Sequence, residues 1–159
     1  MQALRFIMLL SLVVWIGGII FFAAVVAPTV FTVLPTHDLA GKVVSRSLGA
    51  LHWMGIVSGI IFLIASIWYS RLDAGFAQPF ATRNVLVMIM LVLTLISVFV
   101  VGTKMLTIRA DIGIIDNVPQ DDPRRVAFND LHRWSTRLEV GVLAMGLAVL
   151  YLTGKSLSN

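Results

Sequence analysis

The chain has 159 residues, of which 58% are hydrophobic and only 13% are charged. Ordinary soluble domains carry about 25% charged residues, so this composition is typical of integral membrane proteins. The formal net charge is +4, and the basic residues lie between apolar runs, as expected for contacts with lipid headgroups. This distribution argues against nucleic acid as a partner, and the absence of cysteine excludes disulfides and cysteine nucleophiles.

Four apolar runs predict four membrane-spanning helices, because a bilayer core about 30 Å thick needs about 20 apolar residues per helix. The first run carries no charge from Phe6 to Val33. That is well beyond a signal-peptide core of about 7–15 residues, so we expect a retained span. Pro28 lacks an N–H group and predicts a kink or an end near Ala27. The expected spans of a single domain, residues 1–159, are 6–33, 46–70, 84–105 and 134–153.

The fourth helix is expected to begin well before its apolar span. Asp122 followed by Pro123 is typical of a helix N-cap and a first helical position. After it, apolar residues follow at helical spacing: Ala127, Leu131, Trp134 and Leu138. The sequence therefore predicts an all-α integral membrane four-helix bundle with up-down-up-down topology, whose fourth helix has an amphipathic N-terminal extension.

An even number of spans places both chain ends on one side of the membrane. Four basic residues lie on that side, and eight lie on the side of the first and third connections. Because cytoplasmic loops carry the excess of lysine and arginine, we expect loops 35–47 and 106–133 to be cytoplasmic, in a bacterial inner membrane. The expected partners are membrane lipids, a second copy of the chain or a larger membrane complex.

Glu139 is the most unusual residue of the predicted spans. It lies about 7 Å inside the interface at a rise of about 1.5 Å per residue, where a carboxylate must be paired or must face water. We expect Lys104 or Arg46 as its partner, because both belong to the same membrane face. His132 and Ser135 share its helix face. A structural ion pair and a relay for protons or substrate are both compatible with this pattern.

His52 and His132 begin the second and fourth spans, so the topology places them at the same membrane face, under the long third connection. Imidazole is a common ligand of haem iron, copper and zinc, and helix bundles build such sites from facing helices. The pair predicts a haem b or transition-metal site, with ordinary interfacial hydrogen bonding as the alternative. The expected ligand-binding residues are Arg46, His52, Lys104, His132 and Glu139, and no catalytic residue is expected.

Other polar and small residues favour structural roles. His37 follows Pro35 and is expected in a solvated loop. Gly55 and Gly59 form a small-residue face that lets helix backbones approach closely, and the methionines are expected to fill apolar packing. No GxGxxG, Walker, HExxH or GxSxG motif is present, so nothing indicates a nucleotide enzyme or a hydrolase.

Several short motifs carry a family resemblance. Trp15-Ile16-Gly17-Gly18 and Ala27-Pro28-Thr29 in the first span, with Lys104-Met105 and Leu131-His132 later, make the chain resemble the transmembrane protein 205-like family. The resemblance implies a four-helix membrane domain of largely unassigned activity. Animal relatives are linked to tolerance of platinum drugs, which implies export or metal handling, but the cysteines offered as platinum ligands there are absent here.

A more distant similarity connects the chain with the copper-resistance D family and the membrane protoporphyrinogen oxidase family, in which histidines matter. This similarity implies haem or metal at His52 and His132. The first span contains no histidine, whereas the oxidases carry one early in helix one. We therefore do not expect that oxidase activity.

Three functions remain open from the sequence. The first is a membrane protein that binds a metal, haem or a small polar ligand in a polar pocket at one membrane face, linked to transport or metal tolerance. The second is a non-catalytic accessory or structural subunit of a larger membrane complex, and the third is a haem-binding redox protein. The absence of catalytic motifs favours a role that is not enzymatic.

Overall fold

The computed structural model describes residues 1–158 and, in the last helix, side chains as far as Lys155. Four helical segments are each long and apolar enough to cross a bilayer: Gln2–Val33, His37–Ala74, Thr82–Ile112 and Pro123–Lys155. No strand occurs among the described residues. The predicted all-α membrane bundle of four helices is therefore confirmed.

Two of the spans are interrupted by π-helical turns and two are continuous. In the first, α1 (Gln2–Phe21) continues through η1 (Phe22–Val26) into α2 (Ala27–Val33). In the third, α4 (Thr82–Ile96) continues through η2 (Ser97–Gly102) into α5 (Thr103–Ile112). The second span is α3 (His37–Ala74), and the fourth is α6 (Pro123–Ser158), which follows the short 3-10 turn η3 (Ile115–Asn117).

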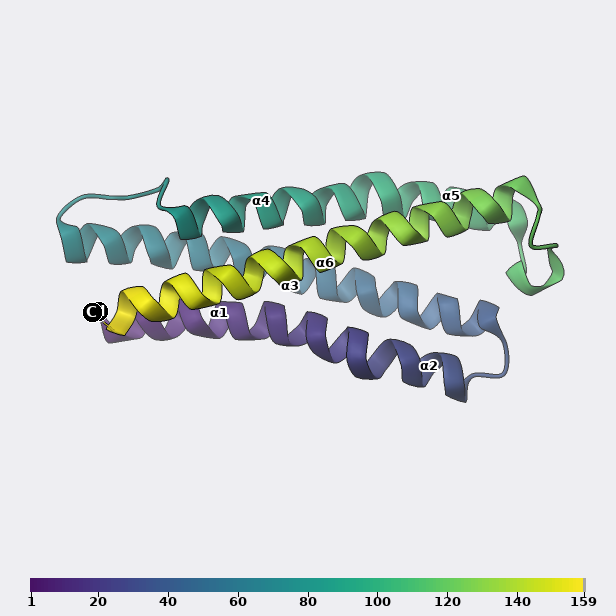
Figure 1. Cartoon of the computed structure of the whole chain (residues 1–159), viewed down its shortest axis with the longest axis horizontal. Helices are drawn as coiled ribbons and strands as arrows, with labels where there is room; N and C mark the ends of the chain where they lie inside the picture. The colour runs from purple at the N-terminus through teal and green to yellow at the C-terminus, as the bar shows by residue number, and fades with distance from the viewer. Residues whose placement is uncertain (159) are drawn as a thin grey trace.

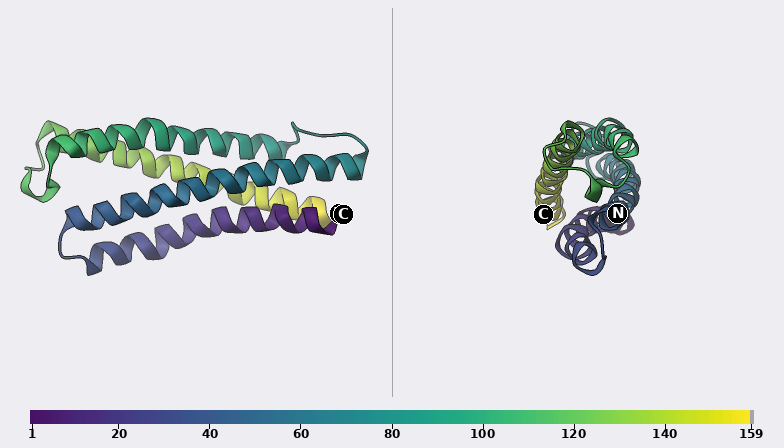
Figure 2. Two further views of the ribbon diagram at one scale, coloured as in Figure 1. Left: turned by 180° about the vertical axis from the view of Figure 1, so that it is seen from behind. Right: turned by 90° about the vertical axis from the view of Figure 1, so that its right-hand side faces the viewer.

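The spans alternate in direction and form a closed ring (Figures 1 and 2). α1 packs against α3 and α6, and α4 packs against the same two helices, so α3 and α6 lie diagonally opposite each other. The start of α1 and the last turns of α6 lie at one end of the bundle, which we call the terminal end (Figure 2). The other end, which we call the α2–α5 end, carries α2, α5, η3 and the first turns of α3 and α6 (Figure 1).

Pro28 does not end the first span. The π-helical turn η1 precedes it, and Ala27 N–H donates there to the carbonyl of Phe22, five residues earlier. This wider turn accommodates a proline, which cannot donate a helical hydrogen bond of its own. The helix then ends at Val33, and Leu34 has extended backbone angles. The expected break near Ala27 is thus a local π-helical turn within a continuous span.

Segment 35–47 is mostly helical, so the prediction of a loop there is wrong. α3 begins at His37, where the Thr36 hydroxyl accepts a hydrogen bond from Leu39 N–H at 3.2 Å. The third connection is likewise shorter than 106–133, because α5 reaches Ile112 and α6 starts at Pro123. Capping side chains and ion pairs set these helix ends, and they lie beyond the apolar runs that mark a span in the sequence.

Close packing of α1 on α3 depends on two glycines. Trp15 is 2% exposed, and a Cβ atom added at Gly55 or at Gly59 would lie only 2.7 Å from a carbon of its indole ring. Only a residue without a side chain leaves room for the ring at these two positions. The expectation that these glycines serve close helix packing is confirmed.

The outer surface of the bundle is apolar on all four spans. Large aliphatic side chains point outward and stay more than half exposed, among them Val13, Ile64, Val92 and Val140. A soluble monomer rarely leaves so much apolar surface in contact with water. This surface is suited to lipid, in agreement with the length of the helices.

The start of α6 confirms the predicted N-cap and shows which residues face the inside of the bundle. Asp122 accepts a hydrogen bond from Arg124 N–H at 2.8 Å, as expected of an N-cap. Trp134, one of the apolar residues at helical spacing, is 56% exposed, and the Arg137 guanidinium lies 5.3 Å from its ring centroid. The inner face of α6 carries residues at intervals of seven, namely Phe128, Ser135, Val142 and Val149, of which the last three are buried. Tryptophan prefers the membrane interface, and this preference outweighs the apolar spacing.

Candidate functional site

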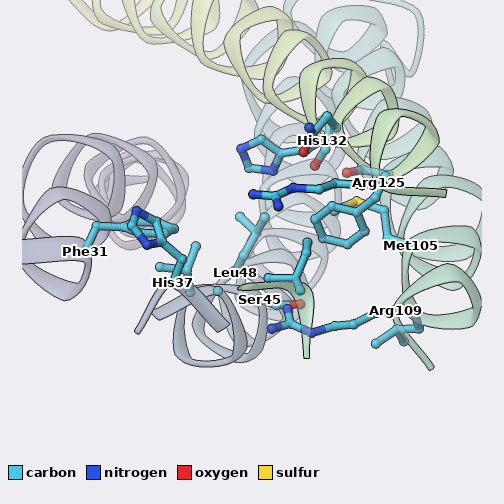
Figure 3. A pocket seen from close by; sticks show the side chains of 18 of the residues that line it. Phe31, His37, Ser45, Leu48, Met105, Arg109, Arg125 and His132 are labelled. Atoms are coloured by element: carbon cyan, nitrogen blue, oxygen red, sulfur yellow. The ribbon is translucent and has the colours of Figure 1, made fainter. Parts of the chain in front are cut away.

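The α2–α5 end of the bundle contains a cavity of about 530 Å³. Its walls come from α2, α3, η2, α5, the η3 connection and the first turns of α6 (Figure 3). Most lining side chains are apolar, including Phe31, Leu48, Met105 and Phe128. A volume of this size lies within the usual range of about 300–1,000 Å³ for small-molecule sites.

A histidine–carboxylate pair, in which the histidine is buried and the carboxylate is partly buried, lies beside the cavity. His52 lines it from α3 and is 6% exposed, and its Nε2 atom lies 3.1 Å from Oε2 of Glu139 on α6. The Glu139 side chain is only 17% exposed. A buried carboxylate needs a hydrogen-bonding partner, and the imidazole supplies one. The predicted partners Lys104 and Arg46 are therefore wrong for this carboxylate.

A second polar cluster fastens the three segments around the cavity. Asp38 is 5% exposed, and its carboxylate pairs with Arg109 Nη2 at 2.9 Å and with Lys42 Nζ at 2.6 Å. Arg109 also donates to the Asp38 carbonyl at 2.7 Å. The Asp38 N–H donates to Oδ2 of Asp116 at 3.0 Å, which ties the first turn of α3 to η3. Arg109 thus lines the cavity with its guanidinium already engaged by Asp38.

Arg125 and His132 line the cavity from the same face of α6, seven residues apart (Figure 3). Arg125 donates to the carbonyl of Val118, which holds the connection against the start of α6. Asp116 and Gln120 of that connection also line the cavity. The expectation that the third connection folds over the histidine end is confirmed.

The predicted ligand-binding residues separate into two groups. His52 and His132 line the cavity, and Glu139 contacts it through His52. Lys104 and Arg46 are exposed and are not among the lining residues. On a helix, a residue displaced by one or two positions from the inner face points away from it, and both cations face outward for this reason.

His37 has a different environment from the expected one. It is the first residue of α3 rather than part of a loop, and it remains exposed. Its ring lies 6.1 Å from that of Phe31, centroid to centroid, and both residues line the cavity opposite Arg125 and His132 (Figure 3). The cavity therefore has imidazole groups from three positions on its walls.

The described part of the chain brings no third metal-ligating side chain to the two predicted histidines. Within residues 1–155, no three side chains of histidine, cysteine, aspartate or glutamate come together as a metal site. Protein metal sites commonly use three or four protein ligands, and Nε2 of His52 is already engaged by Glu139. The metal or haem site at His52 and His132 remains a prediction of the sequence and gains no third ligand from the fold.

Several functional candidates were missed from the sequence. Arg109 and Arg125 were counted only as topology signals, and Asp38 was placed in a loop. One signal was available in the helix that starts at Pro123. Spacings of three and four residues place one set of side chains on the same helix face: Arg125, Phe128, His132, Ser135 and Glu139. Pairing between distant segments, such as Asp38 with Arg109, has no such local signal.

The terminal end carries a separate polar cluster around Tyr69, which is 3% exposed. Its hydroxyl accepts a hydrogen bond from Arg5 Nη2 at 2.8 Å, and the guanidinium groups of Arg5 and Arg83 lie 5.4 Å and 5.8 Å from its ring centroid. Arg83 Nε donates to Ser66 Oγ at 2.9 Å. These contacts join the first three spans and close the bundle at this end.

An apolar four-helix bundle with a mostly apolar cavity at one end defines a small multi-pass membrane protein. The chain belongs to the family described as Domain of unknown function (DUF4149), whose model matches residues 10–113. The match covers the first span from residue 10 onward and the whole of the second and third spans, including His52 and Arg109, and it ends before the start of α6. Neither the curated proteins nor the solved structures gave a match.

Proposed function

We propose that this protein binds a small molecule in the cavity at the α2–α5 end and has no catalytic role of its own. The observation that carries the proposal is the cavity itself. Its volume is about 530 Å³, and its lining is mostly apolar with a few polar groups at fixed positions. Binding sites are built in this way, because apolar walls supply affinity and a few polar groups supply orientation.

The surrounding contacts support a preformed site. The His52–Glu139 pair holds α3 and α6 across the ring, and the Asp38–Arg109 pair holds α3 and α5. Three of the walls are thereby fixed before any ligand binds, which lowers the entropy cost of binding. The resemblance to the transmembrane protein 205-like family adds a role in export, with the cavity as the site where the exported molecule is held.

A matched pair of glycine variants tests this function. Gly49 lines the cavity, and a Cβ atom added there meets no atom within 4 Å. Gly17 has equally open space around it but lies on α1, outside the cavity. Leucine at either position suits a helix better than glycine, so neither Gly49→Leu nor Gly17→Leu should unfold the bundle.

The measurement is native mass spectrometry of the protein released from polymer-extracted membrane discs. We expect the wild type and Gly17→Leu to retain a bound small molecule that Gly49→Leu has lost. Identical adduct patterns in all three proteins would show that the cavity is not a binding site.

A further inference from the structure

The ionisable groups that line the cavity are mostly basic. Two arginines and three histidines contribute to the walls, but only one carboxylate, Asp116, does so. Asp116 is already used as an acceptor by the Asp38 N–H. The polar part of the cavity therefore offers mainly the N–H donors of two guanidinium groups and the nitrogen atoms of three imidazole rings.

The two arginines differ in the charge of their hydrogen-bonding partners. Arg109 is paired with Asp38, whereas Arg125 donates to the uncharged carbonyl of Val118. In the described part of the chain, Arg125 forms no ion pair with a carboxylate. A guanidinium has five N–H donors, so most of those of Arg125 remain available to a ligand beside His132.

A further buried polar group on the cavity wall lacks a partner. Ser97, in η2, is 3% exposed, and its hydroxyl forms no hydrogen bond with any described residue. Leaving a buried hydroxyl unpaired costs about 1–3 kcal/mol. A ligand with acceptor atoms would supply the missing partner.

The edge of the cavity reaches the lipid-facing surface. Phe31, Trp53 and Leu106 all line the cavity and are 45%, 56% and 63% exposed. Their exposed parts belong to the same apolar surface that covers the spans. An apolar chain lying in the bilayer could therefore extend into the cavity without crossing a polar barrier.

From these observations we propose that the ligand is an anionic amphiphile. Its carboxylate or phosphate head binds Arg125 and His132, and its apolar body lies along the walls toward Phe31 and Trp53. Charge-assisted hydrogen bonds from arginine to such heads are short and strong. The inference rests on the proposed function and adds to it the chemical class of the ligand and its entry from the bilayer.

Trp53 provides the readout, because it lies at the edge of the cavity. In a Trp68→Phe, Trp134→Phe background, the remaining tryptophans are Trp53 and the buried Trp15. The probes are a dibrominated fatty acid and its methyl ester, which quench indole fluorescence equally well but differ in head charge. The titration is done in detergent at a pH where the acid is ionised.

We expect the acid to reach half-maximal quenching of Trp53 at a concentration about tenfold lower than the ester does. A factor of about ten in affinity corresponds to one charge-assisted hydrogen bond. Arg125→Gln should remove this preference, and Arg125→Lys should retain part of it. Arg133→Gln is the matched control, because Arg133 lies on α6, is highly exposed and pairs with Asp130 outside the cavity. His132→Gln, which leaves the Val118 contact intact, should reduce the preference.

Three outcomes would overturn the inference. Equal quenching by acid and ester, abolished by Gly49→Leu, would keep the proposed binding function but remove the anionic head. Displacement of the acid by inorganic phosphate alone would assign the site to free anions without an apolar body. If neither probe quenches Trp53 more strongly in the wild-type cavity than in the Gly49→Leu variant, both the inference and the proposed function are wrong.

Discussion

His52 and Glu139 connect the two helices that lie diagonally opposite each other in the ring. The Nε2 and Oε2 atoms are 3.1 Å apart, although the residues are 87 positions apart in the sequence. Helices at opposite corners of a four-helix ring share little direct packing, so this polar contact fixes their separation. It also sets the width of the cavity beside which it lies.

Removing one member of this pair should destabilise the bundle strongly. His52→Leu or Glu139→Leu leaves a buried polar or charged group unpaired, and we expect each to lower the free energy of unfolding by about 3 kcal/mol. The double variant should lose clearly less than the sum, because no unpaired group is left. Unfolding in mixed micelles measures all three. Additive losses would mean that the two side chains do not interact.

The Trp15 contact predicts a penalty for adding a single methyl group. Gly55→Ala places a Cβ atom in contact with the indole ring, and we expect a loss of about 1–3 kcal/mol in unfolding free energy from overpacking. Gly17→Ala, where the added atom meets nothing, should be neutral or slightly stabilising. Thermal unfolding in detergent compares the two variants, and a neutral Gly55→Ala would contradict the packing described here.

The Asp122 carboxylate predicts a low-pH transition at the start of α6. The Arg124 guanidinium, and then the Arg124 N–H, lower the pKa of Asp122 from 3.8 to about 2. Because the pKa of Asp122 is lower in the folded state, its ionised carboxylate stabilises the fold fully above pH 3.8. This stabilisation is lost as the pH falls through about 2. The first turn of α6 should fray in that window.

Carboxyl carbon chemical shifts of the protein in micelles measure this pKa directly. Arg124→Gln should bring the pKa of Asp122 back toward 3.8, because the largest cause of its lowering is removed. A pKa near 3.8 in the wild type would contradict the N-cap geometry.

Single-cysteine labelling tests the predicted orientation, and the absence of native cysteine makes it simple. Cysteine at Gln120, in the third connection, should react with an impermeant maleimide only in inverted inner-membrane vesicles. Cysteine at the exposed Ala77, in the second connection, should react only from the outside of intact cells. The opposite pattern would reverse the topology inferred from the basic residues.

The fold could be predicted from the sequence because lipid imposes a simple rule. Each backbone polar group must be satisfied within its own helix, so apolar length determines the number of spans. Local signals also identified the N-cap at Asp122. The rule says nothing about how far a helix extends beyond the membrane, and therefore the start of α3 at His37 was predicted as a loop.

The site was predicted only in part, for a reason that concerns partners rather than residues. Glu139, His52 and His132 were identified because ionisable groups are rare in apolar spans. Their partners depend on the rotation of each helix about its axis, which hydropathy fixes only to within a broad face. A shift of one residue turns a helix by about 100°. An error of this size in the assumed rotation is enough to make Lys104 the expected partner of Glu139, where the structure has His52.

The π-helical turn η2 has such a rotation built into the third span. An extra residue is accommodated between α4 and α5, so the side chains of α5 are turned relative to an uninterrupted α-helix. Deleting one residue from Ser97–Gly102 would restore regular winding but would swing Met105 and Arg109 off the cavity wall. The bundle would still cross the membrane, but the Asp38–Arg109 ion pair would be lost and the cavity would lack its α5 wall.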